Sequence, residues 1–184
     1  MNLFKSAIES LPQFRELKSA CDENTLPVLV TGVSAIHKAQ IAFSLAEEQM
    51  LIITEDEVTA SRFADDINQM AGDNICLVYP AKDYVFTDIE GASYEYEHRR
   101  LDVLSRLLSG KCRIVAASIE AVLQKTISKE RLSESVITLK QNDDIEIKEL
   151  LSKLVSIGYS RADEKVEGAA QFSARGSIVD IFPV

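Results

Sequence analysis

The sequence predicts an α/β fold with a parallel sheet over residues 1–130, followed by a small α+β domain over residues 131–184. In the first part, short apolar runs alternate with segments of helical periodicity, which is typical of a parallel sheet with right-handed helical crossovers. The four predicted strands are residues 28–30, 51–54, 75–78 and 113–118. In the second part a strand, a helix and two strands are expected, at residues 136–139, 145–157, 159–166 and 178–182. The last of these strands is followed almost directly by Val184. A sheet edge that lacks its next strand is marginally stable, so we expect the second domain to be incomplete at its C-terminus.

The first strand, its loop and the helix after it have the frame of a phosphate-binding loop, Gly-x-x-x-x-Gly-Lys-Ser/Thr. Gly32 and Lys38 fit this frame, but His37 stands at the second glycine and Ala39 at the hydroxyl position. A Cβ at position 37 crowds the approach of backbone amides to phosphate, and alanine offers no oxygen to Mg²⁺. We therefore predict a degenerate loop that binds no cofactor. A working NTPase with an unusual loop is the alternative.

Acidic residues 55–57 follow the second predicted strand and have two interpretations. One is a Walker B site, in which carboxylates handle Mg²⁺ and water. The other is that Asp56 caps the helix after it, as its position just before an apolar periodic segment indicates. The capping role is favoured. This strand comes directly after the first crossover helix, and that placement argues against a Walker B strand.

Composition excludes several classes of protein. The net charge of −9 disfavours sequence-independent binding to nucleic acid. The three cysteines show no metal or redox spacing, and His37 and His98 have no ligand companion, so neither a metal site nor a disulfide framework is predicted. With no signal peptide and no run of membrane-spanning length, a cytoplasmic protein is expected.

Two further segments have structural interpretations. Apolar residues at helical spacing over residues 3–20 predict two helices split at Pro12, whose apolar face covers the core in preference to binding a partner. The aromatic loop at residues 79–88 is expected to cap the core, with a clasp on a neighbouring molecule as the alternative, and a helix is expected from Glu90 to Gly110.

Several motifs resemble the N-terminal, UvrB-like region of bacterial transcription-repair coupling factors. They are Tyr79-Pro80-x-x-Asp83, Arg100-Leu101-x-x-Leu104, Gly158-Tyr159 and the run over residues 171–183, which contains Arg175-Gly176 and ends Phe182-Pro183. The last is the most discriminating. Lys82 and Val85-Phe86 depart from the family's usual first loop, which weakens that motif alone.

The resemblance implies a RecA-like first domain, similar to UvrB domain 1a, with an inactive phosphate loop. It implies a second domain that resembles UvrB domain 2 and docks on UvrA, with Arg175, Gly176 and Phe182 as the candidate partner-binding residues. The family's RNA polymerase-binding and DNA-translocating parts lie beyond Val184. The fragment is thus expected to be a non-catalytic adaptor in transcription-coupled nucleotide-excision repair.

Alternatives remain at the level of single residues and of function. Arg175 could instead pair with Asp163, Glu164 or Asp180, and burial is the default role for Ile178 and Phe182. A UvrB-type helicase is disfavoured, since the chain leaves no room for a long DNA-gripping hairpin after Tyr79. A Rossmann-like enzyme is disfavoured by the absence of Gly-x-Gly-x-x-Gly after a strand, and a Ser/His/Asp centre by the scarcity of histidine.

Overall fold

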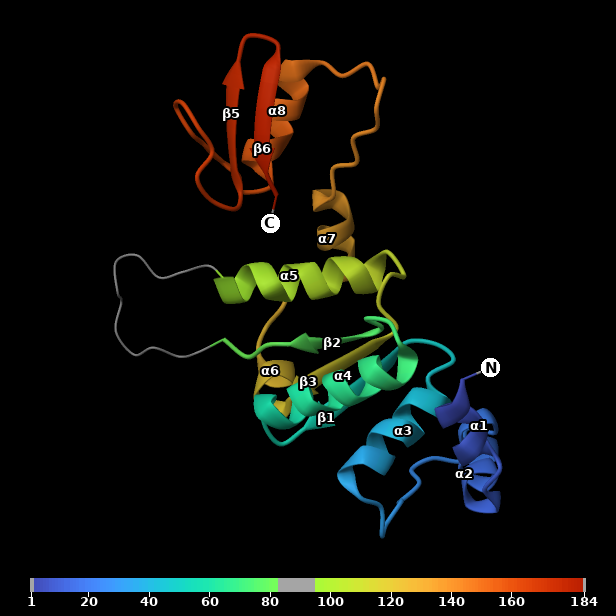
Figure 1. The fold of residues 1–184 in the computed structure, drawn as a ribbon. Coiled ribbons are helices and arrows are strands. Elements are labelled where there is room, and N and C mark those ends of the chain that lie inside the picture. The colour runs from blue at the N-terminus through green and yellow to red at the C-terminus, as the bar shows by residue number, and fades with distance from the viewer. Residues whose placement is uncertain (1, 83–94, 184) are drawn as a thin grey trace. The chain divides into compact units, whose positions relative to one another are not determined.

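The computed structural model describes residues 2–82 and 95–183, and the chain divides into two compact units, Met1–Thr126 and Ile127–Val184 (Figure 1). The expected start of a helix at Glu90 and most of the aromatic loop lie outside the described residues. No helix in the part of the chain that the structure describes is long and apolar enough to cross a membrane.

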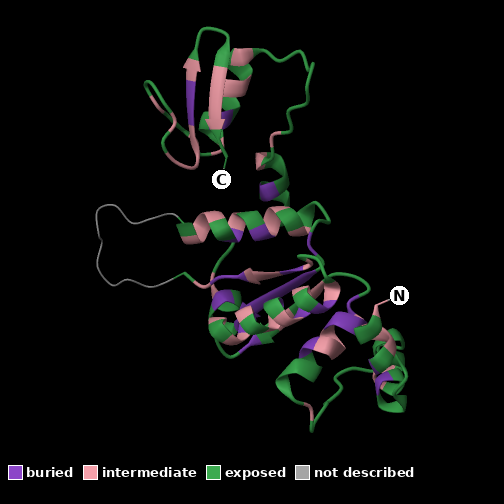
Figure 2. Ribbon diagram, viewed as in Figure 1, coloured by how far each residue is buried: buried purple, intermediate pink, exposed green. Residues whose placement is uncertain are grey.

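The first unit contains a parallel three-stranded sheet with helices on both faces, as the sequence predicts. Strand β3 lies between β1 and β2, and every residue of β3 is buried because neighbours cover it on both edges and both faces (Figure 2). The elements in chain order are α1 (Leu3–Glu9), α2 (Pro12–Asp22), α3 (Ala35–Leu45), β1 (Met50–Thr54), α4 (Glu57–Ala71), β2 (Cys76–Tyr79), α5 (Glu95–Leu108), β3 (Ile114–Ser118) and α6 (Ile119–Leu123).

Alternation along the strands divides the core of this unit into two clusters. One face of the sheet packs on α3 and α4, with Phe43, Ile67 and Ile114 buried in it. The other face packs on α5 and α6 and contains Tyr79 and Val103. The small residues Ala116 and Ala117 face opposite sides of β3 and let helices approach the sheet closely.

Local signals in this unit behave as predicted. Asp56 accepts a hydrogen bond from the backbone N–H of Thr59 at 2.7 Å and caps α4, which confirms the capping interpretation. Gly72 ends the same helix in the left-handed conformation, at φ +69°. Pro12 is the first residue of α2, so it begins a helix at a position that needs no N–H donor, and the predicted split is confirmed.

The predicted strand at residues 28–30 is wrong. These residues lie outside the sheet, and Leu29 is 87% exposed. Three apolar residues are too few to distinguish a strand from a loop, and Pro27 just before them has no N–H to donate to a ladder. The described sheet accordingly has three strands where the sequence predicts four.

The second unit is a small α+β layer, in agreement with its predicted class. Its elements are α7 (Lys129–Ser135), α8 (Ile147–Ser156), β4 (Ser160–Arg161), β5 (Gln171–Arg175) and β6 (Ile178–Phe182). Strand β5 is central, parallel to β4 and antiparallel to β6. Phe172 of β5 and Leu154 of α8 are buried, at 1% and 2% exposure.

Two predictions in this unit need correction. Residues 136–139 form no strand, and Val136 and Leu139 are about half exposed. The long strand expected at residues 159–166 reduces to the two residues of β4. Short helix α7, capped by the Ser128 hydroxyl on the N–H of Arg131, was not predicted because its seven residues contain one buried apolar side chain, Leu132.

Candidate functional site

The degenerate phosphate loop adopts a turn that leads into α3. Gly32 has φ +71°, and Ser34 precedes the first residue of the helix. The Ser34 hydroxyl and Nδ1 of His37 are 2.8 Å apart, so both side chains are engaged with each other at the helix start. Lys38 is exposed, whereas Ala39 is fully buried against the core. The hydroxyl position of the motif therefore faces the protein interior.

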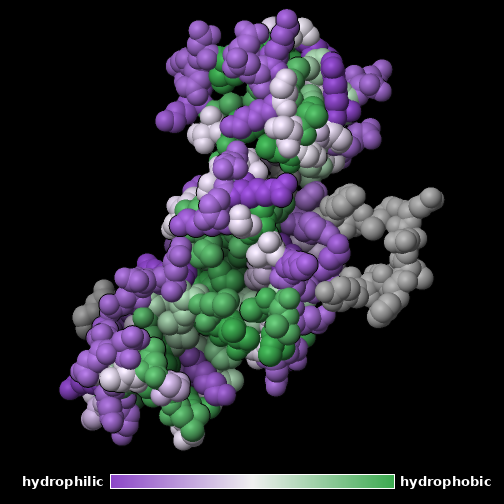
Figure 3. Space-filling view, turned by 180° about the vertical axis from the view of Figure 1, so that it is seen from behind, coloured by the Kyte–Doolittle hydropathy of each residue, from purple (hydrophilic) through white to green (hydrophobic). Residues whose placement is uncertain are grey.

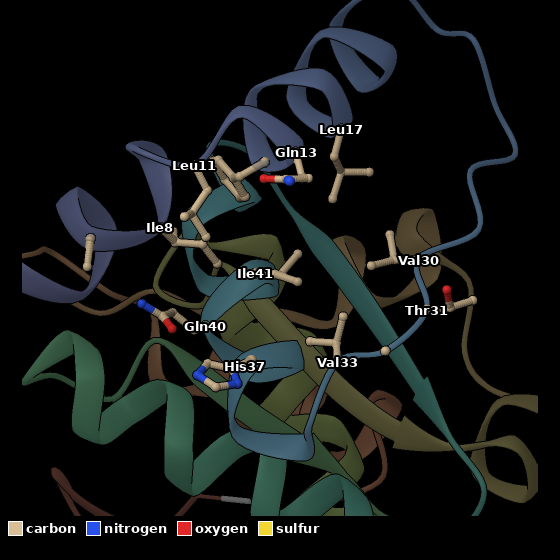
Figure 4. A pocket seen from close by; sticks show the side chains of 13 residues that line it. Ile8, Leu11, Gln13, Leu17, Val30, Thr31, Val33, His37, Gln40 and Ile41 are labelled. Carbon is tan, nitrogen blue, oxygen red and sulfur yellow. The ribbon is translucent and has the colours of Figure 1, made fainter.

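A cavity of about 500 Å³ opens beside this loop, between α1, α2 and α3 (Figure 4). Its walls are mainly hydrocarbon, from side chains such as Leu11, Phe14 and Ile41, with His37 at one end. The residues that line it include no lysine and no arginine, and Lys38 is not among them. A phosphate placed here would lose its hydration without gaining a cation, so the cavity is unsuited to a nucleotide phosphate.

A second apolar surface of the first unit lies on the side of the sheet that packs on α5 and α6. A cavity of about 400 Å³ is lined by side chains of β1, α5 and α6, among them Leu51, Leu107 and Val122. Leu51 and Ile53 of β1 are more than half exposed, and Figure 3 shows apolar side chains gathered on one face of the molecule. Contiguous exposed apolar surface is typical of contacts with protein and offers no chemistry of its own.

Arg100 of α5 is buried, at 7% exposure, and its guanidinium lies at the carboxyl end of β2. Its guanidinium lies 4.1 Å from the centroid of the Tyr79 ring and donates hydrogen bonds to the Pro80 carbonyl at 2.8 Å and to Gln124 Oε1 at 2.9 Å. The Tyr79 hydroxyl bonds the Thr126 hydroxyl at 2.9 Å. Tyr79 is buried, as expected of a residue that caps the core, and the network fixes residues 79–82 to α5 and α6.

In the second unit the predicted partner-binding residues come together on the β5–β6 hairpin. The antiparallel register pairs Arg175 with Ile178, Ser173 with Asp180 and Gln171 with Phe182. Paired residues share a face, and faces alternate along each strand. Arg175, Ile178, Asp180 and Phe182 therefore lie on one face, which we call the outer face of the hairpin.

The opposite face of the hairpin is the more buried one. Phe172 pairs with Ile181 and Ala174 with Val179, and these four residues are buried or half-buried. Gly176 forms the turn, at φ +64°, a conformation that side chains with a Cβ rarely adopt. The loop after β4 also reaches the outer face, since the buried Ser173 hydroxyl donates to the Glu164 carbonyl at 3.2 Å.

The default expectation that Ile178 and Phe182 are buried is wrong. Ile178 is 59% exposed and Phe182 45% exposed. Sequence alternation cannot show which of the two faces is covered. Here the opposite face provides the buried apolar residue Phe172, while Ser173 is the buried residue of the outer face. Of the three carboxylates considered as partners of Arg175, Asp180 makes the ion pair, with Nη2 and Oδ2 2.5 Å apart.

The outer face thus presents an arginine, an aliphatic and an aromatic side chain, a composition enriched in the energetic centres of protein–protein interfaces.

Among the described residues there is no group of three or more His, Cys, Asp or Glu side chains placed to hold a metal ion. Burial raises the pKa of the Cys76 thiol to about 12 and also raises that of Cys112, so neither is an activated nucleophile.

Comparison with known proteins finds a family match that covers the hairpin. Residues 137–184, which include the whole hairpin, match the UvrB interaction domain family. The second unit is therefore similar to UvrB interaction domains over these residues.

The whole chain is similar to transcription-repair-coupling factors. It is 30% identical over its full length to that of Bacillus subtilis (strain 168), and 27% identical over its full length to that of Staphylococcus aureus (strain bovine RF122 / ET3-1). It is 29% identical to that of Staphylococcus haemolyticus (strain JCSC1435) over 96% of the chain. The chain spans only 15–16% of the length of these relatives. The resemblance noted in the sequence is confirmed.

Proposed function

We propose that this chain is the repair-recruiting region of a transcription-repair coupling factor, and that the outer face of its β5–β6 hairpin docks on UvrA. The observation that supports this most directly is the position of Arg175 and Phe182, both exposed on one face of a hairpin that lies within the UvrB interaction domain match. By this docking, the chain recruits nucleotide-excision repair to stalled transcription.

Each of the three proposed contact residues has a distinct role. Arg175 supplies a planar guanidinium, which binds carboxylates bidentately and packs flat against a partner. Phe182 supplies apolar area at the other end of the hairpin face. Gly176 makes no side-chain contact and instead allows the tight turn that holds Arg175 at the end of β5.

The first unit has a structural role in this proposal, as a RecA-like platform similar to UvrB domain 1a. The buried Ala39, the histidine at position 37 and the hydrocarbon walls of the adjacent cavity all disfavour nucleotide chemistry there. ATP-driven translocation on DNA and binding to RNA polymerase are proposed for other parts of a longer protein, which would act in the cytoplasm.

Titration of purified UvrA into the full chain, with the heat of binding measured by calorimetry, tests this function. Arg175→Ala is expected to weaken binding by about 10-fold or more, the usual effect of truncating a central interface arginine. Arg161→Ala is the matched control, since Arg161 is an exposed arginine of the same sheet. Its partner in the register is Phe172, so it lies on the face of the sheet opposite to Arg175.

Equal affinity of the Arg175→Ala variant and the wild type would remove the hairpin from the proposed interface. Equal weakening by both arginine variants would point to a non-specific charge effect and would equally contradict the proposal. Circular dichroism of each variant checks that the fold is retained.

A further inference from the structure

We propose that Ile178 is an additional contact residue of the docking surface and forms with Arg175 a composite anchor for a carboxylate bordered by apolar surface on the partner. This inference rests on the proposed function and adds to it a residue and the chemistry of the partner's side. Neither the motifs in the sequence nor the family match assigns a partner-binding role to Ile178.

The register of the hairpin places the two side chains together. Arg175 and Ile178 are Cα partners across β5 and β6, next to the Gly176 turn. Directly opposed residues of an antiparallel pair have Cβ atoms about 5 Å apart and project from the same face. The aliphatic stem of Arg175 and the branched side chain of Ile178 therefore form one continuous apolar strip that ends in a guanidinium.

Exposure sets Ile178 apart from the apolar residues that build the second unit. It is 59% exposed, whereas Phe172 and Leu154 are almost completely buried. Its side chain contributes little to the core, so its apolar area is available to a partner. An aliphatic group beside an arginine also excludes water when a partner covers both, and a charged hydrogen bond is stronger where water is excluded.

The charge on this strip determines which partner group fits it. The ion pair with Asp180 uses one N–H of a guanidinium that has five, and both partners of the pair are exposed, at 57% and 41% for their side chains. A partner carboxylate can therefore share the guanidinium with Asp180 or displace it at small cost. An apolar border around that carboxylate complements Ile178.

The test compares Ile178 variants with a matched control in titrations of UvrA into the full chain. Ile178→Ala is expected to weaken binding by about 10-fold. Ile178→Thr should weaken it similarly, while its β-branched side chain keeps the strand propensity that alanine lacks. Ile178→Val, which keeps most of the apolar area, should stay within about 3-fold of the wild type.

Val155→Ala is the control, because Val155 is a β-branched aliphatic residue of the same unit that is 58% exposed on α8. It is expected to leave affinity unchanged. The double variant Arg175→Ala/Ile178→Ala should lose less affinity than the product of the single losses, since each side chain acts partly through the other.

The outcomes separate this inference from the function on which it rests. Loss of binding in Arg175→Ala with wild-type affinity in Ile178→Ala and Ile178→Thr would overturn the role of Ile178 and leave UvrA docking in place. Wild-type affinity in Arg175→Ala, or no binding by the wild-type chain, would overturn both. Equal losses in Ile178→Ala and Val155→Ala would also contradict a composite anchor.

Discussion

Arg175 of β5 and Asp180 of β6 form an ion pair across the hairpin, with Nη2 and Oδ2 separated by 2.5 Å on the outer face. The pair is diagonal, because Asp180 lies opposite Ser173 in the register and Arg175 lies opposite Ile178. Arg175 is thereby held against its own strand pair while more than half of its side chain stays exposed. The arginine is oriented by the hairpin without being buried in it.

We predict that this ion pair contributes little to stability. A double-mutant cycle with Arg175→Met and Asp180→Asn should give a coupling free energy below about 1 kcal/mol, since exposed ion pairs are screened by solvent. The measurement is native-state hydrogen exchange at the amides of β5 and β6, repeated in 1 M salt, where the coupling should fall further. A coupling well above this range would mean that a partner could not release Arg175 cheaply.

Arg100→Lys should destabilise the first unit by about 1–3 kcal/mol. Lysine cannot stack a planar group on Tyr79 while donating to both Pro80 and Gln124, and the acceptors left unpaired carry a desolvation penalty. Urea denaturation followed by circular dichroism measures the change. The exposed neighbour Arg99 provides the control, and Arg99→Lys should leave the midpoint unchanged. Similar midpoints for the two variants would show that the network contributes no stability.

Thiol labelling at pH 8 should modify Cys21 quickly and leave Cys76 and Cys112 intact. Cys21 is exposed, whereas burial raises the pKa of Cys76 to about 12, so only about one thiol in 10,000 is ionised at this pH. Burial also raises the pKa of Cys112. Mass spectrometry should find one label in the folded chain and three after unfolding in guanidinium. Rapid labelling of Cys76 in the folded chain would contradict the packing of β2.

Titration of Mg-ATP into the chain should give no heat and no thermal shift at millimolar nucleotide. The reason is local: Ala39 has no oxygen and faces the core, and His37 places a side chain where a phosphate loop needs glycine. Lys38→Ala should behave as the wild type does. Micromolar binding that disappears in Lys38→Ala would restore the working NTPase as the explanation of this loop.

Several parts of the fold follow from local signals that a sequence displays directly. Asp56 before a periodic apolar segment, Pro12 at a helix start and Gly72 at a helix end all act within one turn of their own positions. The central strand of the first sheet was predictable for a similar reason, because the buried run from Ile114 to Ala117 is apolar on both faces. The run from Gln171 to Phe182 supported the family resemblance by the identity of its residues.

The failures involve short elements whose environment is set by distant residues. Residues 28–30 have the composition of a strand but pair with none, and β4 keeps only two residues because its pairing with β5 extends no further. Arg100 is unremarkable on its helix until the fold brings it to Tyr79 and Gln124. Such contacts join residues more than 20 positions apart, and no local pattern contains them.

The sequence by itself determined the fold class, the departures of His37 and Ala39 from the phosphate-loop motif and the family resemblance, because each depends on which residue types occupy fixed local spacings. Only the tertiary structure decided how the hairpin presents its residues. Alternation shows that Arg175, Ile178 and Phe182 share a face, but which face is covered depends on the packing of other elements. That packing buries Phe172 and leaves Ile178 exposed beside Arg175.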